Sequence, residues 1–147
     1  MGETARILIV DDDESIRDVL STVLKKNGYI VDTAKNGKEA IKKSNAKFFN
    51  LALIDIRLPD MEGTQLLTAM KETTPKMVKI IITGYPSLDN AIEAVNKGAD
   101  SYVLKPFNME KLLKTIKEHL KKQEENKKYS QKKVAEFIET RVKEMSL

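Results

Sequence analysis

The chain has 147 residues, 41% hydrophobic and 33% charged, with a net charge of +4, which suits one globular domain with room for an extra helix. It contains no cysteine and one histidine, so disulfides, thiolate metal sites and multi-histidine centres are excluded. No apolar run approaches the roughly 20 residues that span a bilayer, and the first residues do not resemble a secretion signal, so we predict a cytoplasmic protein without membrane contact.

Over the first 120 residues, short apolar runs alternate with segments of helical spacing. The runs predict five strands, at Arg6–Val10, Tyr29–Ala34, Leu51–Ile54, Lys79–Thr83 and Ser101–Leu104. Apolar residues at helical spacing form four stripes: Ile16, Val19, Leu20, Val23 and Leu24; Leu66, Leu67 and Met70; Ile92 and Val95; and Met109, Leu112, Leu113, Ile116 and Leu120. A further helix is expected after Asn36-Gly37. This alternation predicts an α/β fold: a doubly wound, flavodoxin-like, five-stranded parallel sheet of order 2-1-3-4-5.

The segment after Lys121 is charged and then regains an apolar stripe, formed by Val134, Phe137, Ile138, Val142 and Met145. This spacing predicts an additional C-terminal helix, which either extends the preceding helix or forms a sixth one. We therefore divide the chain into a domain over residues 1–122 and a helical extension or linker over residues 123–147. Eight basic and five acidic residues alternate from Lys121 onward. We interpret them as a solvated helix and predict no direct contact with nucleic acid.

Polar side chains lie where the predicted strands end. They are Asp11, Asp12 and Asp13 after the first strand, Asp55 after the third, Thr83 at the end of the fourth and Lys105 after the fifth. The carboxyl ends of parallel strands meet at one edge, and strands 1 and 3 are neighbours in the predicted order. We therefore expect Asp11 and Asp12 to lie beside Asp55. Asp13 is better interpreted as a helix cap or first-turn acid that points away from this edge.

Carboxylates at close range repel one another and favour a hard cation, for which Mg²⁺ (or Mn²⁺) is the natural choice. Lys105 adds a positive charge and Thr83 a hydroxyl donor, so the set can hold a phosphoryl group with its charge compensated. A carboxylate can itself be the nucleophile and form an aspartyl phosphate. Taken singly, these residues are more often solvated turn acids, strand-end hydroxyls and surface lysines. The prediction depends on their occurring together at one edge.

In order and spacing, four stretches resemble the receiver domains of two-component response regulators: Ile7–Asp13, Leu53–Gly63, Ile80–Gly84 and Gly98–Phe107. The resemblance covers about residues 5–120. It implies that a sensor histidine kinase or a phosphotransfer protein phosphorylates Asp55. It also implies that the chain is not an enzyme, beyond taking up a phosphoryl group from a donor and losing it slowly.

The resemblance implies a metal-binding role for four residues. Asp12 and Asp55 would bind Mg²⁺ through their side chains, Asp11 would contribute through water, and Arg57 would contribute its backbone carbonyl.

A second set would bind the phosphoryl group and respond to it. Thr83 and Lys105 would hold phosphoryl oxygens, and the Lys105–Pro106 peptide bond, with Pro106 as its proline, would be cis. Tyr102 would be an aromatic switch that turns inward as Thr83 moves, although strand alternation alone favours plain packing for this residue.

Phosphorylation is expected to shift a pre-existing conformational equilibrium. The resemblance places the readout face on the fourth helix, fifth strand and fifth helix, at Pro86–Asn96, Ser101–Leu104 and Met109–Leu120. It places kinase docking on the first helix, with Ile16 and Leu20, which are equally suited to the core. Whether the chain forms a homodimer, through the readout face or through the C-terminal helix, is left open by the sequence.

Three positions bear on the lifetime of the phosphoryl group. Gly84 is small and should ease access to the site, whereas Arg57 and Tyr85 are bulky and occupy positions that tune dephosphorylation in such domains. We predict a fairly long-lived phosphorylated form.

Two other functions were weighed. A phosphatase of the haloacid-dehalogenase type also uses an aspartate nucleophile with Mg²⁺, but that family has a second acid where this chain has Arg57. A non-phosphorylated interaction module is the other alternative, and the complete set of polar residues argues against it. Whether the chain is a stand-alone receiver or the front of a longer regulator stays open.

Overall fold

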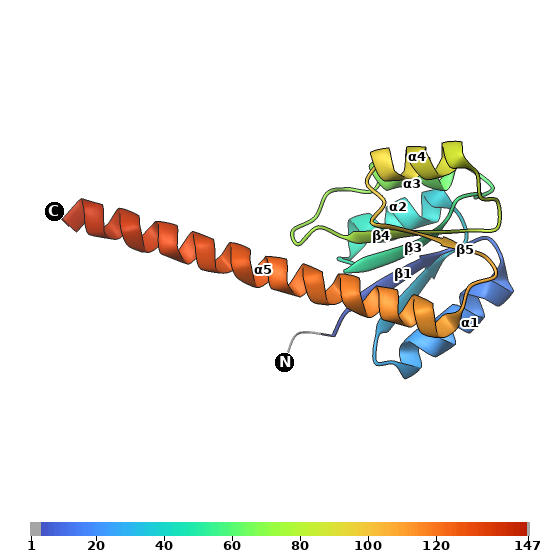
Figure 1. The fold of residues 1–147 in the computed structure, drawn as a ribbon, viewed down its shortest axis with the longest axis horizontal. Coiled ribbons are helices and arrows are strands. Elements are labelled where there is room, and N and C mark those ends of the chain that lie inside the picture. The colour runs from blue at the N-terminus through green and yellow to red at the C-terminus, as the bar shows by residue number, and fades with distance from the viewer. Residues whose placement is uncertain (1–3, 147) are drawn as a thin grey trace.

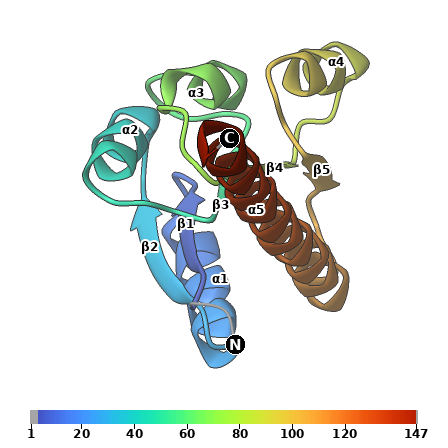
Figure 2. The ribbon, with the colours of Figure 1, turned by 90° about the vertical axis from the view of Figure 1, so that its left-hand side faces the viewer.

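The protein is a five-stranded parallel sheet with helices on both faces. A computed structural model describes residues 4–146. The elements in chain order are β1 (Arg6–Val10), α1 (Glu14–Lys26), β2 (Ile30–Ala34), α2 (Gly37–Ala46), β3 (Leu51–Asp55), α3 (Gly63–Ala69), β4 (Val78–Thr83), α4 (Leu88–Asn96), β5 (Ser101–Leu104) and α5 (Met109–Ser146). The strand order is β2-β1-β3-β4-β5, so the predicted fold class is confirmed. Helices α2, α3 and α4 cover one face, and α1 and α5 cover the other (Figure 1, Figure 2).

All five predicted strands occur, with bounds that differ by at most one residue. β3 includes Asp55 as its last residue, and β4 begins one residue earlier, at Val78. The register pairs Val10 with Ile54 and Asp55 with Ile82, so the ends of β1, β3 and β4 lie at one edge.

The central strands are buried on both faces, as their continuous apolar sequences indicate. Alternate residues enter two separate cores. Toward α2, α3 and α4, the strands contribute Leu8, Val10, Ala52, Ile54 and Ile81. Toward α1 and α5, they contribute Ile7, Ile9, Leu51, Leu53, Val78, Ile80 and Ile82, which pack against Leu20, Leu24, Leu112 and Ile116.

Two of the predicted helical stripes lie only partly in the core. Val19 on α1 is 55% exposed. On α4, Ile92 and Val95 are 49% and 66% exposed, and Ala94 is the buried residue. Ile92 and Val95, which helical spacing groups into one stripe, therefore face outward, because the small side chain of Ala94 is the one turned toward the core. With Leu104 of β5 also half exposed, apolar side chains face outward on both α4 and β5.

A lysine is buried in the sheet. Lys79 of β4 is 5% exposed, and its Nζ donates a hydrogen bond of 2.6 Å to the carbonyl of Leu67 in the last turn of α3. Burial lowers the pKa of this amine. The positive group meets the negative end of the helix, so Lys79 ties α3 to β4.

Helix α5 has 38 residues and runs without a break through residues 122 and 123. The extension therefore continues the preceding helix and is not a sixth one; the division of the chain into two parts stays a prediction. At a rise of about 1.5 Å per residue, the helix is about 57 Å long. Its first part packs on the sheet, and the rest projects away from the domain (Figure 1). Among the described residues, none of the helices has the length and apolar character needed to cross a membrane.

One side chain marks the point where α5 leaves the sheet. Gln123 is 8% exposed, and its Nε2 donates hydrogen bonds of 2.8 Å to the carbonyls of Asn50 and Lys76. Its Oε1 accepts a bond of 3.2 Å from Nδ2 of Asn50. This amide therefore anchors the helix to the edge where β3 and β4 begin.

Candidate functional site

Three acids meet at the carboxyl edge of the sheet. Oxygens from Asp11, Asp12 and Asp55 all lie within 4.8 Å of one another. Asp11 and Asp55 are 4% and 7% exposed, whereas Asp12 is exposed to solvent. Oxygen ligands of this kind, with one side open to water, suit a hard divalent cation.

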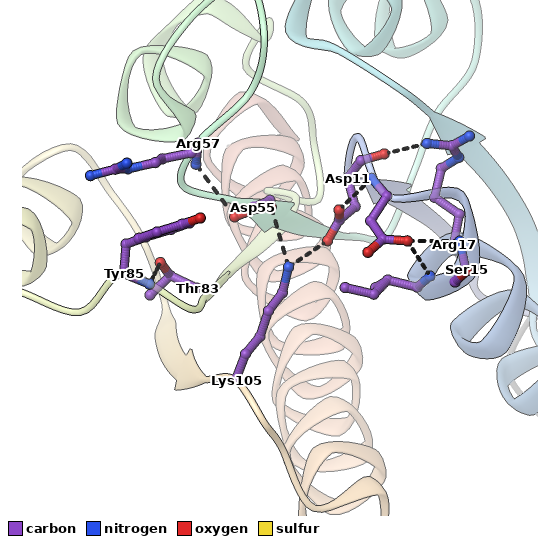
Figure 3. Close-up of polar contacts among 10 residues, drawn as sticks. Asp11, Ser15, Arg17, Asp55, Arg57, Thr83, Tyr85 and Lys105 are labelled. Carbon is purple, nitrogen blue, oxygen red and sulfur yellow. Dashed lines mark hydrogen bonds and ion pairs between the residues drawn. The ribbon is translucent and has the colours of Figure 1, made fainter.

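Lys105 lies between two of these acids (Figure 3). Its Nζ donates to Oδ2 of Asp11 at 2.9 Å and to Oδ2 of Asp55 at 3.2 Å. Burial on its own lowers the pKa of Lys105, but the hydrogen bonds and charges of Asp11 and Asp55 outweigh it and raise the pKa. The lysine is therefore a fixed positive charge at this edge.

The pKa of Asp55 is raised above its ordinary value. Burial is the main cause and the negative charge of Asp11 the second, while Lys105 and the backbone N–H of Arg57 act in the opposite direction. Two carboxylates so close disfavour ionisation of both unless a further cation is present.

The loop after β1 is held by hydrogen bonds of its own. The Asp13 N–H donates to Oδ1 of Asp11 at 2.9 Å, and the Asp13 side chain caps α1 by accepting from the N–H groups of Ser15 and Ile16. The prediction that Asp13 is a cap is confirmed. Arg17 donates through Nη1 to the carbonyl of Asp11 at 2.7 Å (Figure 3). Arg17 was not among the predicted site residues, although its place one turn into the helix is within reach of this loop.

The loop between β3 and α3 is fixed at two points. The carboxylate of Asp60 accepts hydrogen bonds of 2.9 Å from the N–H groups of both Gly37 and Lys38 at the start of α2, and these bonds lower the pKa of Asp60. At the other end of the loop, the Gly63 N–H donates to the carbonyl of Ile56 at 2.6 Å. A Cβ on Gly63 would lie 2.3 Å from the backbone oxygen of Asp55, so only glycine fits there. The backbone around Arg57 is thus firmly placed relative to Asp55.

Thr83 ends β4 and is fully buried. Its Oγ1 accepts a hydrogen bond of 2.9 Å from the N–H of Tyr85. The Tyr85 ring stacks with the guanidinium of Arg57, whose carbon lies 4.0 Å from the ring centroid. Figure 3 shows this pair beside Asp55. Sequence analysis singled out Arg57 and Tyr85 separately but did not foresee their contact.

Two further features lie on and after β5. Tyr102 packs against the core under α2, α3 and α4, and among the described residues its hydroxyl is the only buried side-chain polar atom without a hydrogen-bond partner. The Lys105–Pro106 peptide bond is cis, the arrangement that the resemblance implies. The Thr74–Pro75 bond is also cis, which nothing in the sequence analysis anticipated.

Comparison with known proteins identifies the family. Residues 7–117 match the response regulator receiver domain. The chain belongs to this family. A curated relative, transcriptional regulatory protein ZraR of Klebsiella oxytoca, is 41% identical over 119 residues, which are 81% of this chain and 27% of that protein. The chain thus spans about a quarter of the length of the curated relatives it matches.

Solved structures agree with this receiver fold. A CheY-like receiver domain protein from Methanospirillum hungatei JF-1 shares 48% identity with a TM-score of 0.81, over 84% of this chain and 99% of that one. The beryllofluoride-activated NtrC4 receiver domain dimer shares 42% identity with a TM-score of 0.74, over 80% of this chain and 98% of that one. The chain is therefore a receiver domain of the two-component type, and the phosphatase alternative is not favoured.

Proposed function

We propose that Asp55 accepts a phosphoryl group from the phosphohistidine of a sensor histidine kinase or a phosphotransfer protein. One observation carries the proposal: three carboxylates lie within 4.8 Å of one another, and Lys105 Nζ bonds to two of them. This cluster provides a nucleophile, a place for a cation and a fixed positive charge at one edge of the sheet.

The donor set fits Mg²⁺ or Mn²⁺. It consists of oxygen atoms alone, and the exposed Asp12 leaves room for water ligands. We propose that Asp12, Asp55 and the Arg57 carbonyl bind the ion and that Asp11 contributes through water. When bound, the ion would neutralise charge on the phosphoryl oxygens and allow Asp55 to stay ionised.

The residues of the chain have separable roles in the transfer. An Asp55 carboxylate oxygen forms a bond to phosphorus while the bond from phosphorus to the histidine nitrogen breaks, and its electron pair stays on that nitrogen. Lys105 has three N–H donors and can bind a phosphoryl oxygen while it keeps Asp11. The Thr83 oxygen accepts from the Tyr85 N–H, so its own O–H is available to donate to another phosphoryl oxygen.

The same set supports a switch. Movement of Thr83 toward a phosphoryl group would make room beside β5, and the unbonded Tyr102 hydroxyl would gain a partner by turning. We propose that phosphorylation thereby favours one arrangement of α4, β5 and α5. The exposed Leu88, Ile92, Val95 and Leu104 make the first two elements a suitable surface for a partner protein.

The proposal assigns no enzymatic turnover to the chain beyond slow loss of its own phosphoryl group. Kinase docking on α1, a cytoplasmic location and the absence of direct nucleic-acid binding by this chain stay predictions. The output of any longer regulator would depend on segments outside this sequence.

The decisive experiment is intact-mass spectrometry after incubation with acetyl phosphate and Mg²⁺. The native chain should gain one phosphoryl group, and Asp55→Asn should gain none. Asp13→Asn is the matched control, because asparagine also caps helices, and it should be phosphorylated normally. A gain on Asp55→Asn equal to that on the native chain would refute the assignment. Sustained hydrolysis of an aryl phosphate would instead support a phosphatase.

A further inference from the structure

One face of α5 runs along the whole helix. Leu112 and Ile116 are buried on this face against the sheet, and Gln123 reaches Asn50 and Lys76 from it. Beyond the domain, the same face carries Val134 and Met145. The positions of Leu112, Gln123, Val134 and Met145 recur about every 11 residues, close to three turns, so each repeat is displaced by only about 20° around the helix.

The exposed continuation of this face is apolar. Val134, Phe137, Ile138 and Met145, here called the tail stripe, are 58%, 66%, 55% and 82% exposed. Because the tail stripe is in phase with the buried face, it points to the same side of α5 as the sheet does. Figure 1 shows that the domain lies along the first part of α5 and that the rest of the helix extends past it. A partner that covers the tail stripe must therefore lie on this side of α5, past the edge of the sheet where β3 and β4 begin.

We propose that the tail stripe is a contact between two copies of this chain whose α5 helices run antiparallel. A parallel, in-register pair would place the partner's residues 109–123 against the face that the sheet already covers. An antiparallel pair avoids this overlap, because Val134 then lies opposite the partner's Met145 and the two domains lie at opposite ends. About 16 Å of helix separates Gln123 from Val134, which leaves room for the partner helix.

Charges flanking the tail stripe fit the antiparallel arrangement. Lys133 and Glu144 are also about 11 residues apart, so they lie on the same flank. When two helices run antiparallel, like flanks meet, and Lys133 comes beside the partner's Glu144 twice in the pair. Both side chains are exposed and have only weak local contacts, Lys133 with the ring of Tyr129 at 5.6 Å and Glu144 with Arg141 at 3.4 Å. They are therefore available for a partner.

The contact is small, so the dimer should be weak. The four apolar side chains of the tail stripe on each copy bury less than the roughly 1,200 Å² typical of stable complexes. We therefore expect a dissociation constant in the micromolar range or higher. Association should therefore be measured by sedimentation equilibrium on the full chain across a wide concentration range.

Four variants test the surface. Ile138→Glu should raise the dimer dissociation constant at least tenfold. Val95→Glu, at an apolar site on α4 that is 66% exposed against 55% for Ile138, lies outside the tail stripe and should leave the constant unchanged. Lys133→Glu should weaken the dimer severalfold, and adding Glu144→Lys should restore it, a rescue that loss of folding would not show. A chain that stays monomeric at every concentration, or one that dissociates with Val95→Glu and not with Ile138→Glu, would overturn the proposal.

Helix direction can be tested because the chain has no cysteine. Val134→Cys and Met145→Cys chains, one of them carrying a mass tag, are mixed and oxidised. The antiparallel pair should form the mixed disulfide, since these positions face one another, and little of either symmetric disulfide. Predominantly symmetric disulfides at both positions would show a parallel pair and overturn the proposal.

Discussion

The guanidinium of Arg57 stacks on the ring of Tyr85 at 4.0 Å and so joins the loop after β3 to the loop after β4, beside Asp55 (Figure 3). We expect the water that hydrolyses an aspartyl phosphate at Asp55 to approach past this pair, which lies beside the carboxylate. The contact therefore gives a structural basis for the prediction of a long-lived phosphoryl group.

Removing either partner should shorten that lifetime. A cation–π contact contributes about 0.5–2 kcal/mol, so Arg57→Ala or Tyr85→Ala should speed phosphoryl loss about two- to thirtyfold. The double variant should be little faster than the single ones, because both remove the same contact. Decay of the phosphorylated band on a phosphate-affinity gel measures the rate, with Tyr129→Ala on the projecting part of α5 as control. Rapid loss from the native chain would contradict the prediction.

Asp55→Asn should stabilise the protein when no divalent ion is present. Burial raises the pKa of Asp55, so between the unfolded and folded pKa values the folded chain binds more protons, and the free energy of unfolding falls as pH rises through that window. The neutral amide lacks this penalty. At neutral pH in EDTA, Asp55→Asn should unfold at a higher temperature, and the difference should disappear as pH falls below about 4.

With Mg²⁺ present, the native chain should unfold at a higher temperature than Asp55→Asn, the reverse of the order expected in EDTA. Mg²⁺ should raise the unfolding temperature of the native chain and have little effect on Asp55→Asn, because the substitution removes one of the proposed ligands. Asp18→Asn, at an exposed acid of α1, is the control and should respond to Mg²⁺ as the native chain does. A lower unfolding temperature for Asp55→Asn in EDTA would show that the buried charge is not a cost to folding.

Two glycines near the site should respond very differently to alanine. At Gly63 the new Cβ would lie 2.3 Å from the Asp55 carbonyl oxygen and 2.8 Å from Ile56 Cα, both of them backbone atoms. Gly63→Ala should cost about 3 kcal/mol or more in urea unfolding. At Gly84 the nearest atoms are 3.8 Å and 3.9 Å away in the Lys105 side chain, so Gly84→Ala should be close to neutral. If both substitutions changed the free energy of unfolding equally, the loop after β3 would have to be able to move away from the new Cβ of residue 63.

Tyr102→Phe should increase stability. The Tyr102 hydroxyl is buried without a hydrogen-bond partner, and its removal should raise the free energy of unfolding by about 1 kcal/mol. Tyr129→Phe, at a 62% exposed ring, should cause no change. If the hydroxyl is needed as a switch, the more stable Tyr102→Phe chain should still be phosphorylated but should show a smaller conformational response. Destabilisation would indicate that the hydroxyl is bonded in the native protein.

The sequence was sufficient to predict the sheet and the cluster of acids at its carboxyl edge. Continuous apolar runs such as Ile7–Val10 are typical of strands that are buried on both faces, and parallel strands bring their carboxyl ends together. Strand order and this shared edge are therefore sufficient to predict that Asp11 lies next to Asp55. On α4, the helical spacing of Ile92 and Val95 predicted an apolar face but did not indicate whether the sheet or a partner covers it.

Several contacts that hold the site loops and the long helix α5 in place were missed. Arg17, Asp60 and Gln123 each bond to backbone groups, two of them on other elements far along the chain. Such bonds depend on where the backbone lies after folding and not on the residue type at the other end. Periodicity and motif spacing therefore carry no signal for them.

The buried amine of Lys79 has a consequence for chemical labelling. With 5% exposure, a lowered pKa and a bond to the Leu67 carbonyl, this lysine is shielded from acylating reagents while α3 stays on the sheet. Exposed lysines such as those of the projecting helix react without any such opening. The rate of Lys79 acylation should therefore report how often α3 detaches from the sheet. Lys79 is thus a built-in probe of local unfolding at the face that α3 covers.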